Sequence, residues 1–168
     1  MSNDAASQVA YAARVLKTPA ITSVFADLAD TAREQGWTYE EYLAAVLGRQ
    51  VADREASGIQ VRTRAARFPQ VKTLEDFNVD HQPTLRRDVL AHLATSTYIG
   101  KAGTVVLLGP PGVGKTHLAI ALGHKAIAAG YAVQFDTAVG WLTRLQAAHA
   151  GNRLEAELRK LRRYKLLI

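Results

Sequence analysis

The sequence contains no cysteine, and none of its apolar runs is long enough to span a bilayer. The absence of cysteine excludes disulfide bonds and thiolate metal sites. The first 18 residues are rich in Ala, Ser, Asn, Asp and Gln and lack the apolar centre of a signal peptide. We therefore predict a soluble cytoplasmic protein without a membrane-spanning segment.

Acidic residues are scarce in the last part of the chain. The 168 residues carry a net charge of +6, and their hydrophobic and charged contents, 48% and 21%, are those of an ordinary soluble protein. Residues 1–103 hold twelve basic and twelve acidic residues, whereas residues 104–168 hold nine basic and only three acidic ones. This excess of positive charge favours a polyanionic partner such as DNA or RNA. The alternative is a solvated basic helix whose acidic partners lie elsewhere.

Residues 1–69 have the pattern of an all-helical N-terminal module. Apolar side chains recur at helical spacing over residues 20–35, and Gly36 is expected to end that helix. Thr38 and Glu41 have the spacing of a capping box, which predicts the start of a second helix. We expect the second helix to run almost to the end of the module, where a proline stops it.

Residues 70–103 are predicted to connect this module to the rest of the chain. Residues 70–83 have the composition of a linker and contain the string Leu74-Glu75-Asp76-Phe77. An amphipathic helix is expected to follow over residues 85–97, because its apolar side chains recur every three or four residues. Two glycines bracket its end.

Residues 104–168 alternate between apolar strands and helices. Residues 104–108 form a continuous apolar run, as a parallel strand buried on both faces requires. The segments that follow are predicted to be a helix, a strand, two helices and a strand, over residues 115–129, 131–135, 138–150, 153–163 and 164–168. This order predicts an α/β fold with right-handed crossovers onto a parallel sheet.

The most specific motif follows the first of these strands and reads Gly109-Pro110-Pro111-Gly112-Val113-Gly114-Lys115-Thr116. Its glycines let backbone N–H groups point at an anion, and the next helix offers its N-terminal N–H groups and dipole to the same anion. Lys115 is predicted to contact the β- and γ-phosphates, and the Thr116 hydroxyl to ligate Mg²⁺. The motif therefore predicts binding of a nucleoside triphosphate, namely ATP with Mg²⁺.

Kinases, GTPases, helicases and AAA+ machines share such a loop, so the flanking residues must narrow the class. Gly109-Pro110-Pro111-Gly112 resembles an AAA+ loop, and Lys115-Thr116-His117-Leu118-Ala119 resembles initiator and helicase-loader ATPases. The longer string through Gly123-His124 closely resembles the IstB-like family, helper ATPases encoded beside transposases in insertion sequences. Further strings similar to that family are Leu16-Lys17-Thr18-Pro19-Ala20, Ala65-Ala66-Arg67-Phe68-Pro69, Lys72-Thr73-Leu74-Glu75-Asp76-Phe77 and Arg162-Arg163-Tyr164-Lys165-Leu166-Leu167-Ile168.

The resemblance implies an AAA+ P-loop core over residues 104–168 and a role as an ATP-binding helper of DNA transposition. It implies binding to duplex DNA, ATP-dependent assembly into homo-oligomers and assistance to a partner transposase. Lys115 is the predicted catalytic residue, and the predicted nucleotide-binding residues are Gly109, Pro110, Pro111, Gly112, Val113, Gly114, Lys115, Thr116 and His117. The candidate DNA contacts, with a solvated helix face as the alternative, are Arg159, Lys160, Arg162 and Arg163.

His117 and Phe77 each have a functional and a structural interpretation. His117 adjoins the loop, and a packing or hydrogen-bonding role for its side chain is favoured over a catalytic one. Phe77 could lie near the adenine, as the connector does in many AAA+ proteins, but core packing is favoured.

The family continues into an acidic Walker B pair, which binds Mg²⁺ through water and activates the attacking water, whereas the sequence stops at Ile168. We therefore expect a truncated form that binds nucleotide and hydrolyses ATP poorly. Three other functions stay open: a DnaC-type replicative helicase loader, a small-molecule kinase, and a non-hydrolysing remnant that binds DNA or a partner. The helical module ahead of the loop and the basic flank argue against the kinase.

Overall fold

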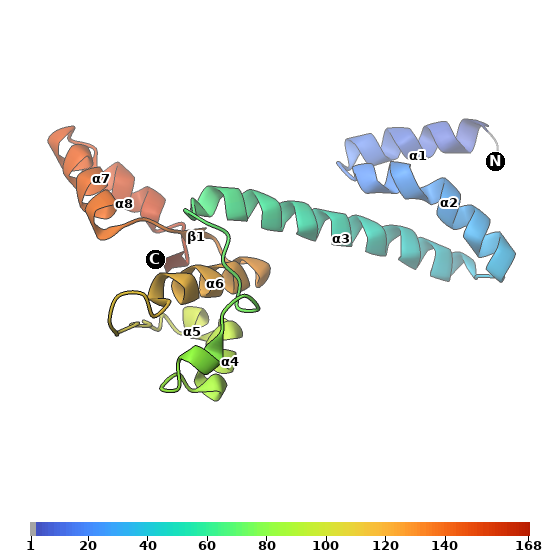
Figure 1. Cartoon of the computed structure of the whole chain (residues 1–168). Coiled ribbons are helices and arrows are strands. Elements are labelled where there is room, and N and C mark those ends of the chain that lie inside the picture. Colours follow the sequence, from blue (N-terminus) through green and yellow to red (C-terminus); the bar gives the residue numbers. More distant parts are fainter. Residues whose placement is uncertain (1–2) are drawn as a thin grey trace. The chain divides into compact units, whose positions relative to one another are not determined.

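The computed structural model describes residues 3–168, which are mostly helical and include one small parallel sheet (Figure 1). By their internal contacts the residues form two compact units that divide between Gly58 and Ile59. This boundary lies inside one long helix, α3 (Tyr39–Ala66). The three-part division expected from the sequence stays a prediction.

The first unit consists of α1 (Asn3–Val15), α2 (Pro19–Gln35) and the first part of α3. The helix α1 has no counterpart among the elements predicted from periodicity. The apolar side chains that the unit buries come from all three helices and are Ala13, Ala20, Phe25 and Val46.

Two hydrogen bonds join α2 to α3 inside this unit. The Tyr42 hydroxyl donates to the Phe25 carbonyl at 2.9 Å. The Ala20 amide donates to Gln50 Oε1 at 3.1 Å, and Gln50 is only 7% exposed. The amides of a first helical turn have no partner within their own helix, so the glutamine satisfies a donor that would otherwise be buried unpaired.

Both turn signals predicted between α2 and α3 are confirmed. Gly36 has a φ of +68°, and its amide donates to the Ala32 carbonyl. The Glu41 amide donates to Thr38 Oγ1 at 3.2 Å, and the Thr38 amide donates to Glu41 Oε2 at 2.7 Å. These reciprocal bonds are those of a capping box.

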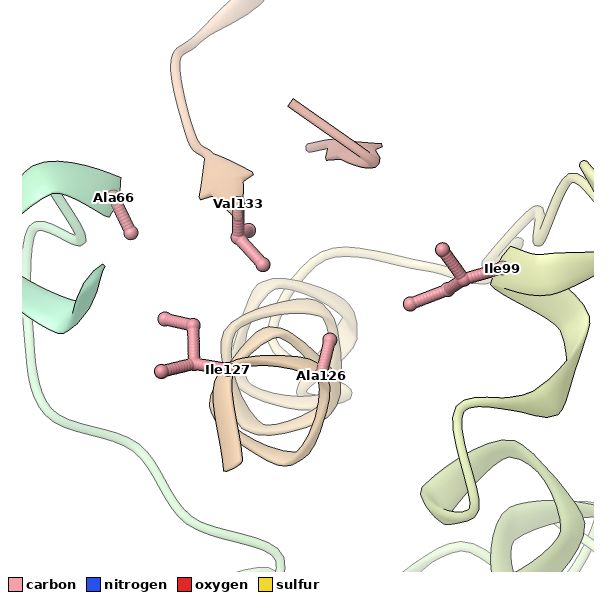
Figure 2. Close-up of a cluster of buried hydrophobic side chains, with 5 residues drawn as sticks. All are labelled: Ala66, Ile99, Ala126, Ile127 and Val133. Atoms are coloured by element: carbon pink, nitrogen blue, oxygen red, sulfur yellow. The ribbon is translucent and has the colours of Figure 1, made fainter. Parts of the chain in front are cut away.

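In the second unit, one apolar cluster forms between α6 (Lys115–Ala128), α5 (Thr97–Gly100), the end of α3 and β1 (Val133–Gln134). Figure 2 shows Ala126 and Ile127 on α6, with Val133, Ile99 and Ala66 approaching from the other elements. Ala66, Ala126 and Ile127 have no exposed surface. The cluster fixes one side of α6.

A second apolar cluster lies on α6 nearer its N-terminus and includes residues of the predicted linker. Its buried members are Leu90 of α4 (Arg87–Ala94) and Leu118 and Leu122 of α6. The partly buried side chains that pack against them are Leu74, Phe77, Val79, Leu85, Leu93 and Leu107. The prediction of a linker over residues 70–83 was therefore wrong for Leu74 and Val79, whose apolar side chains pack into this core, whereas the core packing favoured for Phe77 is confirmed. A short 3₁₀ helix, η1 (Val79–His81), also forms there.

The single helix predicted over residues 85–97 is broken into α4 and α5. Ser96 separates the two with a φ of +60° and is 1% exposed. The two helices pack in different apolar clusters: Leu90 of α4 packs in the second cluster, and Ile99 of α5 packs in the first. Helical periodicity could not indicate this change of direction, because the apolar spacing continues across the break.

The sheet consists of β1 and β2 (Leu166–Leu167), which pair in parallel with Val133 opposite Leu166. The helices α7 (Ala138–Ala150) and α8 (Leu154–Leu161) lie between the two strands in sequence. The α/β order of strand, two helices and strand is therefore confirmed for this part of the chain.

The strand predicted over residues 104–108 joins no sheet within the described residues, so that prediction was wrong. Val106 is 69% exposed and Leu108 is 88% exposed, whereas Leu107 packs in the second cluster. Leu107 and Leu166 line one cavity of about 380 Å³, so open space rather than a hydrogen-bond ladder lies between them. The continuous apolar run predicted burial on both faces, but only one face is covered.

Among residues 3–168, no helix combines the length and the apolar composition that crossing a membrane requires. The longest helix, α3, carries many charged residues.

Candidate nucleotide-binding site

The predicted phosphate-binding loop lies immediately before α6, whose first residue is Lys115. Gly112 has a φ of +83° and Gly114 a φ of +91°, a region that side chains other than glycine rarely adopt. A Cβ on Gly112 would meet no atom within 4 Å, so the backbone angle alone requires glycine there. The loop thus has the local conformation that the Gly-x4-Gly-Lys-Thr pattern predicts.

Lys115 turns back over this loop. Its ammonium donates to the Gly109 carbonyl at 2.8 Å and to the Pro110 carbonyl at 2.7 Å. The positive charge of Lys115 is thereby held against the loop, beside the N-terminus of the 14-residue helix α6. The positive end of the helix dipole and the ammonium together suit a phosphate group, so the residues present fit the triphosphate of ATP.

The apolar residues of α6 anchor the loop to the fold. Most of the helix after its first turn is buried, including Leu118, Ile120 and Leu122. Because the helix cannot shift without breaking both apolar clusters, its N-terminal amides stay in place beneath the loop. A fixed helix N-terminus is the property that an anion site needs.

Thr116 is exposed in the first turn of α6, next to Lys115. Over residues 3–168 no group of three His, Asp or Glu side chains could hold a metal ion. The Thr116 hydroxyl is the loop side chain that could ligate Mg²⁺, which usually keeps several waters and also binds substrate phosphates.

The His117 side chain contacts the segment that follows the N-terminal module (residues 70–103, here called the connector). Its Nε2 lies 2.8 Å from the Thr73 carbonyl oxygen. A carbonyl can only accept, so Nε2 carries the proton and donates. The imidazole also meets the edge of the Phe77 ring, with the centroids 5.3 Å apart. The hydrogen-bonding and packing interpretation of His117 is thus the one its contacts support.

The connector is fixed to α6 at a second point, which the sequence did not indicate. Lys125 Nζ donates to Glu75 Oε1 at 2.6 Å. This hydrogen bond, with other contacts of the same carboxylate, lowers the pKa of Glu75 below its ordinary value. The Leu-Glu-Asp-Phe string lies in this segment, but no local pattern identifies a partner 50 residues away.

His124 lies further along α6, against Phe68, with the ring centroids 4.7 Å apart. Its Nε2 is buried without a hydrogen-bond partner among the described residues. Burial lowers the pKa of His124 below its ordinary value, because the charged imidazolium would lose its hydration. The side chain thus packs as a neutral aromatic ring, as expected for a residue outside the phosphate site.

The candidate DNA contacts lie at the end of α8 and just after it. Arg159, Lys160, Arg162 and Arg163 are all exposed. Lys160 lies 3.4 Å from Glu157, whereas the other three form no ion pair within the described part of the chain. The four cations therefore lie together on one short segment, separate in sequence from the loop that opens α6.

Glu157 holds this segment to α7. Arg144 Nε lies 2.5 Å from Glu157 Oε1, and the Arg144 guanidinium stacks over the Trp141 ring at 5.5 Å from its centroid. The bond from Arg144 lowers the pKa of Glu157. Because Glu157 is already engaged by Arg144, it neutralises only part of the surrounding positive charge.

A glycine-rich loop is followed directly by a largely buried helix, and a lysine of that helix lies against the loop. This is the arrangement of a P-loop ATP-binding protein. The family model described as IstB-like ATP binding protein matches residues 11–168, and the chain belongs to this family.

Curated relatives agree with this assignment. The chain is 41% identical over 141 residues to a protein from Pseudomonas aeruginosa, whose name assigns it to ATP binding and to insertion sequence IS21. It is 33% identical over 144 residues to a similarly named protein of insertion sequence IS5376 from Geobacillus stearothermophilus. These alignments cover 84% and 86% of this chain and 53% and 57% of the relatives, so the chain spans about half the length of the curated relatives it matches.

Proposed function

We propose that this chain binds ATP with Mg²⁺ at residues 109–116 and serves as a helper in DNA transposition. The observation that carries the proposal is the bond pattern of Lys115, whose ammonium rests on the Gly109 and Pro110 carbonyls. On nucleotide binding it exchanges part of these contacts for the β- and γ-phosphates, while the glycine backbone and the first amides of α6 cradle the remaining phosphate oxygens.

Lys115 is also the residue that we propose to act in catalysis. The transition state of phosphoryl transfer spreads negative charge over the γ-phosphate oxygens, and an ammonium held against them stabilises that charge. Mg²⁺ on the Thr116 hydroxyl supplies further charge neutralisation when it is bound. Within this proposal His117 belongs to the site through its contact with the connector.

The transposition role rests on the relatives. Several are named for insertion sequences and for ATP binding. By extension we propose that this chain acts in the cytoplasm, assembles with further copies in an ATP-dependent manner and assists a transposase encoded with it.

Duplex DNA is the proposed polyanion for the basic segment at the end of α8. Three of its arginines, Arg159, Arg162 and Arg163, are exposed and outside any ion pair among residues 3–168. Guanidinium groups in this state can pair with phosphates without first giving up a carboxylate partner. Because the contacts are to phosphates, we expect binding to depend on salt more than on base sequence.

The experiment that tests this function measures duplex DNA binding with ATP, with ADP and without nucleotide, at several salt concentrations. We expect tighter binding with ATP and an affinity that falls steeply as salt rises. The double variant Arg162→Ala/Arg163→Ala should make the slope against salt shallower by about two phosphate contacts. The matched control Arg33→Ala/Arg49→Ala changes exposed arginines of the first unit and should keep the parental slope. Equal binding in all three nucleotide states would contradict an ATP-dependent helper.

The partner is tested separately. The chain, loaded with ATP, is offered the transposase encoded beside it and, in parallel, a hexameric replicative helicase. Retention of the transposase supports the proposal, whereas retention of only the helicase would assign the chain to the helicase loaders.

A further inference from the structure

We infer that the turn formed by residues 73–77, here called the connector turn, is coupled to the nucleotide loop, and that His117 is the positioning residue that couples them. The inference rests on the proposed ATP site. It adds a function for a segment that the sequence presents as a linker.

The connector turn is held together by its own hydrogen bonds. The Asp76 amide donates to Thr73 Oγ1 at 3.2 Å, and the Thr73 hydroxyl donates to Asp76 Oδ2 at 2.7 Å. The Phe77 amide donates to the Leu74 carbonyl at 3.2 Å. These bonds close the turn locally, whereas the packing of Leu74 and Phe77 in the second apolar cluster attaches it to α6.

His117 attaches this turn to the first helical turn of α6. The Nε2–H donates to the Thr73 carbonyl at 2.8 Å, and Thr116, the proposed Mg²⁺ ligand, is the preceding residue. A displacement of the N-terminal turn of α6 would therefore stretch this hydrogen bond directly.

Phe77 makes the second contact, and it touches the loop itself. A Cβ on Gly114 would lie 2.5 Å from one carbon of the Phe77 ring, which is closer than any side chain allows. Gly114 is the last loop residue before α6 and has a φ of +91°. When the backbone at Gly114 moves, the Phe77 ring must move with it, because nothing larger than a hydrogen atom fits between them.

The ion pair between Glu75 and Lys125 anchors the same turn at a distance from the loop. Lys125 follows His117 by eight residues, which is about 12 Å along the helix axis. It holds the connector turn without touching the loop, so it offers a matched control. The pair is exposed, so its loss should weaken the docking of the turn only slightly, and it leaves Gly114 and the first turn of α6 in place.

Coupling between two sites is reciprocal for binding free energies. If the docked turn favours the nucleotide-binding form of the loop, a bound nucleotide must favour the docked turn by the same factor. Binding of a nucleotide to the loop would then make the connector turn more ordered.

The first experiment titrates a fluorescent ATP analogue into the parent, His117→Ala, His117→Gln and Lys125→Met. We expect His117→Ala to weaken binding about five- to tenfold, the range expected from one hydrogen bond. Glutamine can place an amide N–H where the imidazole Nε2–H lies, so His117→Gln should recover most of the affinity. Lys125→Met should bind within about twofold of the parent, because an exposed ion pair contributes little.

The second experiment measures amide hydrogen exchange of residues 73–77 in the parent, with and without ATP. The expected result is slower exchange at the Asp76 and Phe77 amides when ATP is present. This measurement needs no variant, so it tests the coupling between the connector turn and the loop even if His117→Ala fails to fold.

Unchanged exchange, or parental affinity in a folded His117→Ala chain, would overturn the coupling while leaving the ATP site intact. Failure of the parent itself to bind the analogue would instead contradict the proposed function.

Discussion

Phe77 lies so close to Gly114 that a methyl group on residue 114 would come within 2.5 Å of the phenyl ring. The two residues are 37 positions apart in the sequence and belong to the connector and to the phosphate-binding loop. Gly114 therefore meets two requirements, a backbone angle of +91° and the absence of a side chain, only the first of which the motif makes evident.

Replacement of Gly114 with alanine is expected to destabilise the second unit and to weaken ATP binding. The backbone strain and the clash with Phe77 each cost about 1–3 kcal/mol in the free energy of unfolding. Urea denaturation of Gly114→Ala and of Gly112→Ala gives the comparison. Gly112 has a similar φ of +83°, but a methyl group added there would meet no atom within 4 Å, so its variant should lose only the strain part.

A double-mutant cycle separates the clash from the strain. Phe77→Leu in the Gly114→Ala background should recover part of the lost stability, because the smaller side chain leaves room for the methyl group. Strictly additive losses for the two substitutions would show that the ring and the loop are not in contact.

The stability of the second unit is expected to fall as the pH falls below about 6.5, the ordinary pKa of histidine. Burial lowers the pKa of His124 in the folded chain, so the unfolded chain binds more protons in this range. The stabilisation is fully present above the unfolded pKa and is lost as the pH falls toward the folded one. The check is the midpoint of urea unfolding at about pH 7.5 and about pH 5.5.

His124→Leu should reduce this pH dependence, whereas His149→Leu, at an exposed histidine of α7, should keep it. A parental pH dependence in His124→Leu would show that His124 is not the titrating group.

Thr38→Ala is expected to destabilise the first unit by about 1 kcal/mol, because it removes a capping box at the start of α3. Thermal unfolding followed by circular dichroism measures the loss. Thr38→Ser keeps the hydroxyl and should behave like the parent. Destabilisation by Thr38→Ser as large as by Thr38→Ala would show that the methyl group, not the hydrogen bond, stabilises the helix.

The features that the sequence predicted are encoded by neighbouring residues. The Thr38–Glu41 box, the αL cap at Gly36 and the glycine loop each depend on patterns of eight residues or fewer. The helical spacing over residues 20–35 likewise depends on near neighbours, and α2 follows it closely. These signals lie within short stretches of the sequence, which is why the phosphate loop and its helix could be found from the sequence alone.

The features that the sequence missed depend on residues far apart. The hydrogen bond from His117 to Thr73 spans 44 positions, and the pair of Lys125 and Glu75 spans 50. The break at Ser96 reflects two separate cores rather than a local signal. No single-sequence pattern contains that information, so the connector was predicted as a linker and the helix before the loop as one piece.

Lys115 and the loop around it are proposed to bind ATP. The most direct measurement is the titration of a fluorescent ATP analogue with Mg²⁺ into the parent, Lys115→Ala and Lys101→Ala, each shown to be folded by circular dichroism. Lys101 is an exposed lysine at the end of α5 and controls for the loss of one positive charge. Lys115→Ala is expected to weaken binding by on the order of 10- to 100-fold, whereas Lys101→Ala should keep the parental affinity. Equal affinity of Lys115→Ala and the parent would show that this lysine does not bind the nucleotide.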